Sequence, residues 1–285
     1  MKKAVQRSRF TRFKRAIYNP EKNEILGRTC RDWVLIFIFY VLAYLFLAGF
    51  FIGMLSVFLF GYVDSNIPTL TGEQSILKFQ PGIGLAAKPN YFSTFIHVAS
   101  FQSTINEAYI NKVDEIFRKY IPKGANENCN TPGLHPKNPD IPCGFDLSVL
   151  GECQDTEKTL MQGKLCVYLK INRIYGWLPN LEDPAVIPSP GIECGGTNEF
   201  DRESLGTIRY FPEHTAPNGK KYGVISNNYF PYFRMNNYQD PLVAVQFLNV
   251  TKNSVVLVEC HLVGLKNTGA ETAFEVSVDD QDSGK

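Results

Sequence analysis

The sequence predicts a single transmembrane α-helix followed by a mainly-β domain, an antiparallel β-sandwich against which one helix packs. Three observations support this fold class. The uncharged stretch 34–63 is thirty residues long, and about 20 apolar residues suffice to cross a bilayer. Short β-prone segments recur between turn signals in the second half of the chain. One segment before them, 104–120, repeats its apolar residues every three or four positions, as an amphipathic helix does.

The stretch from Val34 to Val63 is the strongest signal in the chain. Leu, Ile, Phe and Val fill most of it, and each contributes about −0.3 to −0.6 kcal/mol to insertion near the helix centre. A cleaved signal peptide would carry a hydrophobic region of only about 7 to 15 residues, with a small-residue cleavage site soon after. We therefore expect the helix to remain in the protein as a membrane anchor.

Basic residues gather before this stretch. Residues 1–33 contain ten Lys or Arg and three acidic residues, a balance of +7, so the remainder is −6 because the whole chain is +1. Basic residues close to a membrane span stay on the cytoplasmic side. The sequence thus predicts a single-pass type II protein with a cytoplasmic tail at 1–33, a transmembrane helix at 34–63, an extracellular stalk at 64–89 and an extracellular β-sandwich domain at 90–285.

The tail has two interpretations. Its basic residues either lie along the anionic inner leaflet, at about 1 kcal/mol per basic residue, or serve only to orient the span. Cys30, at the cytoplasmic edge, is either palmitoylated or a free thiol. In both cases we expect membrane lipid to be a partner of the chain.

Two pairs of residues mark opposite faces of the predicted membrane helix. Tyr40 and Tyr44 are four residues apart and share one face, while Gly49 and Gly53 form a GxxxG pair on the other side. GxxxG pairs let helix backbones approach closely in membranes. Tyr is also common at membrane interfaces, and small residues occur in spans that have no partner. The two pairs together make this helix a candidate for packing against a partner helix.

A connector and one helix precede the β-prone segments. Residues 64–89 are rich in Pro and Gly, which predicts an irregular stalk. Thr104 and Glu107 then form a predicted capping box. Apolar residues follow at helical spacing up to Tyr120, and Pro122 ends the helix.

Six segments of the second half have the composition of strands. They are rich in β-branched and aromatic residues and lie between turn signals. We expect the segments that begin at Leu242 and Val255 to be adjacent strands of one antiparallel sheet, because only a short polar turn separates them. The six predicted strands are Leu165–Ile174, Thr207–Phe211, Tyr222–Ser226, Leu242–Val250, Ser254–Leu265 and Ala273–Val278.

Six cysteines lie on the predicted outer side of the membrane. An even number in an oxidising compartment implies three disulfides, although sequence alone leaves many pairings open. Zinc is the alternative, but these cysteines form no CxxC pair and the four histidines show no ligand spacing. The six are Cys129, Cys143, Cys153, Cys166, Cys194 and Cys260.

The chain lacks the motifs of a catalytic site. No Gly-rich phosphate loop, nucleophile elbow or His-Glu zinc motif is present. The acidic residues of 280–282 have the spacing of a metal-dependent sugar transferase, but they lie in a polar tail that solvation explains. We therefore expect no enzyme activity, cofactor, metal or nucleic-acid partner. Asn249 heads the single N-glycosylation sequon of the predicted outer part.

Three motifs need a further explanation. They are the span from Phe39 to Gly53 with its paired tyrosines and glycines, the segment Tyr229-Phe230-Pro231-Tyr232-Phe233, and the segment from Pro241 to Cys260. Together they resemble the β subunits of the Na⁺/K⁺- and H⁺/K⁺-transporting ATPases, over residues 33 to about 278. The second motif resembles the family's Tyr-Tyr-Pro-Tyr-Tyr signature. Phe230 and Phe233 lack the hydroxyls of the usual tyrosines, so ring packing is what they retain.

The resemblance implies a non-catalytic subunit. Family members bind a multi-span α subunit that hydrolyses ATP and moves ions. They are needed for its folding, stability and delivery to the plasma membrane, and they modulate K⁺ occlusion. The resemblance also implies an immunoglobulin-like sandwich. The single sequon favours the Na⁺/K⁺ pump over the H⁺/K⁺ pump, whose β chains tend to carry many.

The resemblance also assigns roles to particular residues. It places Tyr40 and Tyr44 against a membrane helix of the α subunit, and the segment 229–233 against one of its extracellular loops. Aromatic rings that cover the sandwich core are the alternative for that segment. A luminal glycosyltransferase and a stand-alone adhesion protein are the alternative functions. The disulfides that the resemblance implies are sequential, namely Cys129–Cys143, Cys153–Cys166 and Cys194–Cys260.

Overall fold

The computed structural model describes residues 17–19, 24–64, 68–71, 81–90, 92–101, 103–120, 127–128, 143–234, 237–266 and 270–280. The chain divides into two compact units, Met1–Thr69 and Leu70–Lys285. Most of the predicted cytoplasmic tail and much of the predicted stalk lie outside the described residues.

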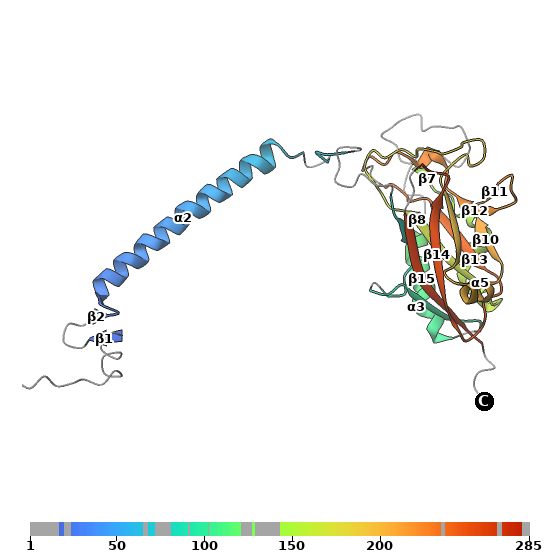
Figure 1. Ribbon diagram of the computed structural model, residues 1–285, viewed down its shortest axis with the longest axis horizontal. Coiled ribbons are helices and arrows are strands. Elements are labelled where there is room, and N and C mark those ends of the chain that lie inside the picture. Colours follow the sequence, from blue (N-terminus) through green and yellow to red (C-terminus); the bar gives the residue numbers. More distant parts are fainter. Residues whose placement is uncertain are drawn as a thin grey trace, which may run out of the picture. The chain divides into compact units, whose positions relative to one another are not determined.

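A long helix dominates the N-terminal unit (Figure 1). α2 runs from Cys30 to Gly61 and begins just before the uncharged stretch, because Thr29 caps it. The Thr29 hydroxyl accepts a hydrogen bond from the backbone N–H of Asp32, whose carboxylate accepts one from the backbone N–H of Thr29. The Trp33 indole donates to the Ile25 carbonyl at 2.9 Å. Three short strands precede the helix, namely β1 (Tyr18–Asn19), β2 (Glu24–Ile25) and β3 (Arg28–Thr29).

Nearly all of the surface of α2 is exposed. None of its residues is buried by the rest of the described chain, and within that part it is the one helix long and apolar enough to cross a membrane. A helix that is apolar on every face needs either a protein interior or lipid around it. The exposed apolar surface therefore agrees with a single-pass membrane protein.

Two sheets form the second unit (Figure 1). The smaller has the strand order β10-β13-β8-β4, and all of its pairs are antiparallel. The larger has the order β11-β12-β9-β14-β15-β5, in which only the edge pair β15–β5 is parallel. The strands are β4 (Ile83–Leu85), β5 (Phe95–Ala99), β8 (Leu165–Ile171), β9 (Gly191–Gly196), β10 (Ile208–Phe211), β11 (Glu213–Thr215), β12 (Lys221–Val224), β13 (Leu242–Phe247), β14 (Val255–Val263) and β15 (Glu271–Asp279).

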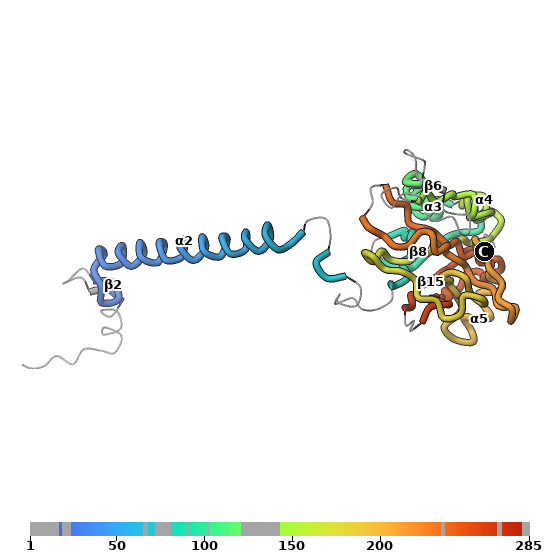
Figure 2. Tube along the Cα trace, turned by 90° about the horizontal axis from the view of Figure 1, so that it is seen from above, coloured from blue at the N-terminus to red at the C-terminus, as the bar shows by residue number. Residues whose placement is uncertain are grey.

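Short helices cover the sheets. Figure 2 shows α3 (Thr104–Phe117) and α4 (Thr156–Met161) on one side of this unit and α5 (Glu199–Leu205) on the other. Three 3₁₀ helices and a short parallel strand pair complete the part of the unit that the structure describes. These elements are η2 (Arg118–Tyr120), η3 (Leu147–Gln154), η4 (Asn227–Tyr229), β6 (Glu127–Asn128) and β7 (Cys143–Gly144).

α3 is the packed helix that the sequence predicts, but its cap differs from the prediction by one residue. Ser103, not Thr104, is the N-cap, and its hydroxyl accepts a hydrogen bond from the backbone N–H of Ile105. Ser103 has the extended backbone that an N-cap requires, whereas Thr104 is already helical. The buried Tyr109 hydroxyl donates to the Cys166 carbonyl at 2.7 Å and so fixes α3 to β8.

One hydrophobic core joins the two sheets. It includes buried side chains from both, such as Val167 and Val245 of the smaller sheet and Val258 and Phe274 of the larger. All residues of β13 are buried, as in a strand that is covered on both faces. The second unit is thus a mainly-β domain with one continuous core.

β13 and β14 are consecutive strands that belong to different sheets. The expectation that they pair with each other was wrong. β13 pairs with β10 and β8, and β14 pairs with β9 and β15. Because each strand already has two antiparallel neighbours, neither has an edge left for the other. The segment 248–254 instead carries the chain from one sheet to the other.

Part of the predicted stalk has β structure. Ile83–Leu85 forms β4 and pairs with β8, and the side chains of Ile83 and Leu85 are buried. A Cβ at Gly84 would lie 2.6 Å from the side-chain oxygen of Asn172. The glycine that indicated irregular chain is therefore needed for close approach within a sheet.

Two disulfides join described cysteines. Cys153–Cys166 links η3 to β8, and Cys194–Cys260 links directly paired residues of β9 and β14. Both pairings are those that the resemblance implies. Cys143 is disulfide-bonded too, while Cys129, its implied partner, lies outside the described residues.

Candidate functional site

The aromatic segment 229–233 begins inside the domain. Tyr229 ends η4, is only 3% exposed, and packs its ring against that of Phe145. Its hydroxyl donates to the Gly144 carbonyl at 3.2 Å. Tyr229 therefore belongs to the core and anchors the segment to it.

The remaining rings of the segment reach the surface. Phe230, Pro231 and Tyr232 are partly buried, and Phe233 is 43% exposed. The peptide bond between Phe230 and Pro231 is cis. Exposure thus rises along the segment from Tyr229 to Phe233.

A second segment, 175–178, packs along the first. Tyr175 and Tyr232 form a parallel bridge, and the backbone N–H of Gly176 donates to the Tyr232 carbonyl at 2.9 Å. Trp177 packs edge-to-face on Phe230 at 5.1 Å between ring centroids, and Tyr175 on Phe233 at 5.5 Å. Leu178 is 62% exposed. We call the combined set the aromatic surface, and its members are Tyr175, Trp177, Leu178, Phe230, Pro231, Tyr232 and Phe233.

Sequence reasoning missed the second half of this surface. The run Tyr175-Gly176-Trp177 was the available signal, since two large rings around a glycine are unusual in a solvent-exposed turn. Gly176 has φ +68°, a left-handed conformation that L side chains rarely adopt. It turns the chain so that both of its aromatic neighbours lie along the 229–233 segment.

A cluster of charged side chains packs against the aromatic surface. The buried carboxylate of Asp240 accepts hydrogen bonds from Arg173 Nε at 2.5 Å and Nη2 at 2.9 Å, and from Lys170 Nζ at 2.9 Å. The Arg173 guanidinium lies over the rings of Tyr232 and Tyr238, 5.3 and 5.0 Å from their centroids. Burial opposes ionisation of Asp240, but the hydrogen bonds from Arg173 and the charge of Lys170 hold the pKa of this carboxyl below its usual value.

Two tyrosine hydroxyls close this network. Tyr120 donates to the backbone carbonyl of Asp240 at 2.7 Å, and Tyr238 donates to that of Tyr229 at 3.2 Å. The network therefore joins η2, the residues just before β13 and the aromatic segment. Ring positions at the surface depend on polar groups that lie beneath them.

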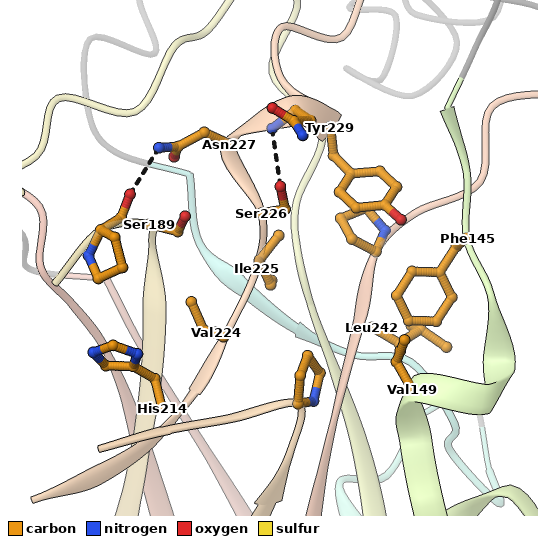
Figure 3. Close-up of a pocket in the computed structure, with 14 residues that line it drawn as sticks. Phe145, Val149, Ser189, His214, Val224, Ile225, Ser226, Asn227, Tyr229 and Leu242 are labelled. Atoms are coloured by element: carbon orange, nitrogen blue, oxygen red, sulfur yellow. Dashed lines mark hydrogen bonds between the residues drawn. The ribbon is translucent and has the colours of Figure 1, made fainter. Parts of the chain in front are cut away.

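A cavity of about 480 Å³ borders the segment (Figure 3). Phe145 and Tyr229 form its apolar side, and His214 and Asn227 lie across from them. The Asn227 amide nitrogen donates to the Pro188 carbonyl at 2.9 Å. A cavity with this lining accommodates an apolar group better than a charged one.

The candidate residues of α2 lie in the other unit. The rings of Tyr40 and Tyr44 are stacked, with centroids 6.2 Å apart. A Cβ at Gly49 or Gly53 would meet nothing within 4 Å. Within the described chain, both faces of the helix are thus open to a neighbour.

The sequon follows β13 directly. Asn249 is exposed, so its side chain is accessible to a modifying enzyme. Its own backbone is tightly packed, because a Cβ at Gly206 would lie 2.6 Å from the Asn249 carbonyl oxygen. The accessible amide therefore sits on a rigid turn.

Residues 3–279 match the family described as the sodium/potassium ATPase beta chain. The chain belongs to this family. The match includes α2 and the β domain up to the end of β15. The protein is accordingly a β chain, a regulatory and non-catalytic subunit rather than the catalytic α subunit.

Curated relatives share most of their length with this β chain. It is 32% identical to a probable sodium/potassium-transporting ATPase subunit beta-3 of Caenorhabditis briggsae, covering 87% of this chain and 79% of that protein. Identity to the sodium/potassium-transporting ATPase subunit beta-2 of Rhinella marina is 32%, over 88% and 86% of the two chains. Identity to the human subunit beta-2 is 29%, over 88% and 85%.

Proposed function

We propose that this β chain assembles with the catalytic α subunit of a Na⁺/K⁺-ATPase, supports its folding, stability and delivery to the plasma membrane, and modulates K⁺ occlusion. The observation that carries the proposal is a family match that includes the membrane helix and the β domain together. A subunit that acts through assembly needs surfaces rather than a catalytic site, and each unit offers one.

The membrane surface is α2. Its tyrosine pair and its glycine pair lie on different faces, and the rest of the described chain buries neither. Small residues permit close backbone contact between membrane helices, while Tyr hydroxyls can hydrogen-bond across them. We assign Tyr40, Tyr44, Gly49 and Gly53 to contacts with membrane helices of the α subunit.

The outer surface is the aromatic surface. Exposed aromatic rings that are held rigidly are typical anchors of protein interfaces, where truncation of one ring costs about 2 kcal/mol or more. Phe230, Tyr232 and Phe233 present such rings to an extracellular loop of the α subunit, and Pro231 lies between them in sequence. Tyr229, which is buried, acts by positioning them.

The proposed role implies a membrane topology for the chain. The N-terminus is cytoplasmic and the β domain is extracellular, where Cys129–Cys143 forms a third disulfide and Asn249 carries a glycan. The two sheets and their shared core support an immunoglobulin-like arrangement of the domain.

Co-expression tests the proposal directly. The full-length chain and an α subunit are produced in cells that lack their own β chain. We expect α to co-precipitate with wild type and to reach the cell surface, and Tyr232→Ala to reduce both at least severalfold. Phe200→Ala is the matched control, because Phe200 is an exposed ring of α5, 61% exposed, outside the aromatic surface.

Two outcomes would contradict the proposal. Surface delivery of α that is equal with and without this chain would exclude the subunit role. Normal assembly with Tyr232→Ala would instead show that the aromatic surface is internal packing, and would leave α2 as the contact.

A further inference from the structure

The outer face of the larger sheet carries a cluster of three possible metal ligands. Glu259 and His261 are two residues apart on β14, so their side chains project from the same face. Glu271 of β15 is the direct cross-strand partner of His261. Strand pairing therefore brings together residues that are ten positions apart in sequence.

Distances show that these side chains converge without bonding to one another. His261 Nε2 lies 4.0 Å from a Glu259 oxygen, and His261 Nδ1 lies 3.9 Å from a Glu271 oxygen. Both exceed hydrogen-bond length. One ring nitrogen and one oxygen of each carboxylate lie within 4.8 Å of one another. In a tetrahedral zinc site, bonds of about 2.0–2.2 Å keep ligand atoms about 3.4 Å apart, which small side-chain rotations can reach.

Within the described chain, neither carboxylate is paired with Lys or Arg. Among the described residues, the ion pairs of Glu259 and Glu271 are with His261 and with no Lys or Arg. Glu193, the partner of His261 on its other side, is paired with Lys220 at 3.2 Å. The cluster thus combines two uncompensated acidic groups with one imidazole.

The backbone beneath the cluster is rigid. The Cys194–Cys260 disulfide joins β9 to β14 between Glu259 and His261 in sequence, and Cys260 is fully buried on the opposite face of the strand. β14 and β15 are both inner strands of the larger sheet. Ligands on such strands need little reorganisation to bind an ion.

We propose that Glu259, His261 and Glu271 bind a divalent transition-metal ion, with Zn²⁺ the best match. Imidazole with carboxylates suits zinc, whereas Mg²⁺ and Ca²⁺ prefer oxygen ligands alone. Three protein ligands leave a fourth position for water. The ion would bridge β14 and β15 on the outer face of the domain.

Calorimetry of the full-length chain in detergent tests the site. A Cys30→Ser background removes the free thiol, which could hold zinc itself. We expect one Zn²⁺ per chain, and an affinity at least tenfold lower for His261→Gln, since loss of even an outer partner of a ligand costs about 10- to 100-fold. Glu271→Gln should weaken binding as well, and Ca²⁺ or Mg²⁺ should not compete at equal concentration.

His97→Gln is the matched control. His97 also lies on a strand of the larger sheet beside a carboxylate, but it is bonded to Asp279 at 2.8 Å and has no third ligand. Its substitution should leave zinc affinity unchanged. Absence of Zn²⁺ binding to wild type, or equal affinity in His261→Gln, would overturn the proposal.

Histidine modification adds a residue-level measurement. Diethylpyrocarbonate labels exposed imidazoles, and mass spectrometry locates the label. Zn²⁺ should protect His261 and leave His97 and His214 unchanged. Equal labelling of His261 with and without zinc would place the bound ion elsewhere.

Discussion

The membrane helix and the aromatic surface are both exposed, but the chain builds them differently. In the described part of the chain, the ring contacts of Tyr40 and Tyr44 are with rings of their own helix. The aromatic surface rests on the buried residues Tyr229 and Asp240 and on the more exposed Arg173, which pairs with Asp240. A substitution of either tyrosine therefore changes the contact surface of α2 without changing the fold of the β domain. A substitution in the aromatic segment can change the fold and the partner surface together, so the two surfaces need different controls.

The two ends of the aromatic segment give the largest expected contrast. Tyr229→Ala removes a buried ring and should lower the free energy of unfolding by about 3–5 kcal/mol. Phe233→Ala removes an exposed ring and should cost less than about 1 kcal/mol, while weakening assembly with α. Urea unfolding of the full-length chain in detergent, followed by Trp177 fluorescence in a Trp33→Phe background, measures both. Similar losses of unfolding free energy for the two variants would contradict the division of the segment into a buried end and an exposed end.

Acid should weaken the Arg173–Asp240 pair that supports the aromatic surface. The folded protein holds the pKa of Asp240 below its ordinary value. Its ionised form therefore stabilises the fold above about pH 4, and this contribution is lost as pH falls through the folded pKa. Asp240→Asn should be less stable than wild type at neutral pH, and the difference should shrink below about pH 4. A difference that stays constant across this range would contradict the ion-pair role.

Glycosylation of Asn249 would test on which side of the membrane the β domain lies. Asn249→Gln should abolish the mobility shift that an N-glycosidase produces, because Asn249 is exposed and heads the one sequon of the outer part. Asn253→Gln is the control, since it changes a nearby Asn outside any sequon. A glycosidase shift that persists in Asn249→Gln would contradict the assignment.

The smallest effect is expected in α2. Tyr40→Ala with Tyr44→Ala should leave α–β assembly intact, because the β domain remains bound, but should change apparent K⁺ affinity by less than about fivefold. K⁺-activated ATPase assays of the complex measure this. Phe50→Ala is a control, because Phe50 lies between the tyrosine face and the glycine face of the helix. Loss of assembly in the double variant would make α2 the dominant contact.

Long apolar runs made much of the fold predictable from sequence. β13 and β14 carry almost continuous apolar residues, and both were placed within a few positions. Their assignment to different sheets was not predictable, because it depends on distant neighbours such as β8 and β9. Pattern indicates that a strand forms, and only tertiary packing decides its partners.

One inner strand, β9, was not predicted because it is rich in glycine. β9 contains Gly191, Gly195 and Gly196, which resemble a turn in sequence. A Cβ at Gly191 would lie 2.8 Å from the Tyr222 ring, and one at Gly196 would lie 2.3 Å from the backbone nitrogen of Arg202. Two of these glycines therefore allow close packing against β12 and α5.

Of the aromatic surface, one segment was predictable from sequence and the other was not. The segment 229–233 was found because its aromatic residues are consecutive in sequence. Tyr175 and Trp177 were missed because only the bridge from Tyr175 to Tyr232 brings the second segment beside the first. A surface assembled from two segments has no local sequence signature.

The two sheets also differ in when their last strand is synthesised. The smaller sheet has all of its strands once residue 247 has been made, since β13 is its last member in sequence. In the larger sheet, β15 lies between β14 and β5, and the paired residues Phe95 and Glu275 are 180 positions apart, so β5 is synthesised long before its neighbour. A ribosome that stops before Glu271 would release a chain with one finished sheet and one with an unpaired inner edge. Such an edge exposes unpaired backbone N–H and C=O groups, which favour aggregation until β15 covers them.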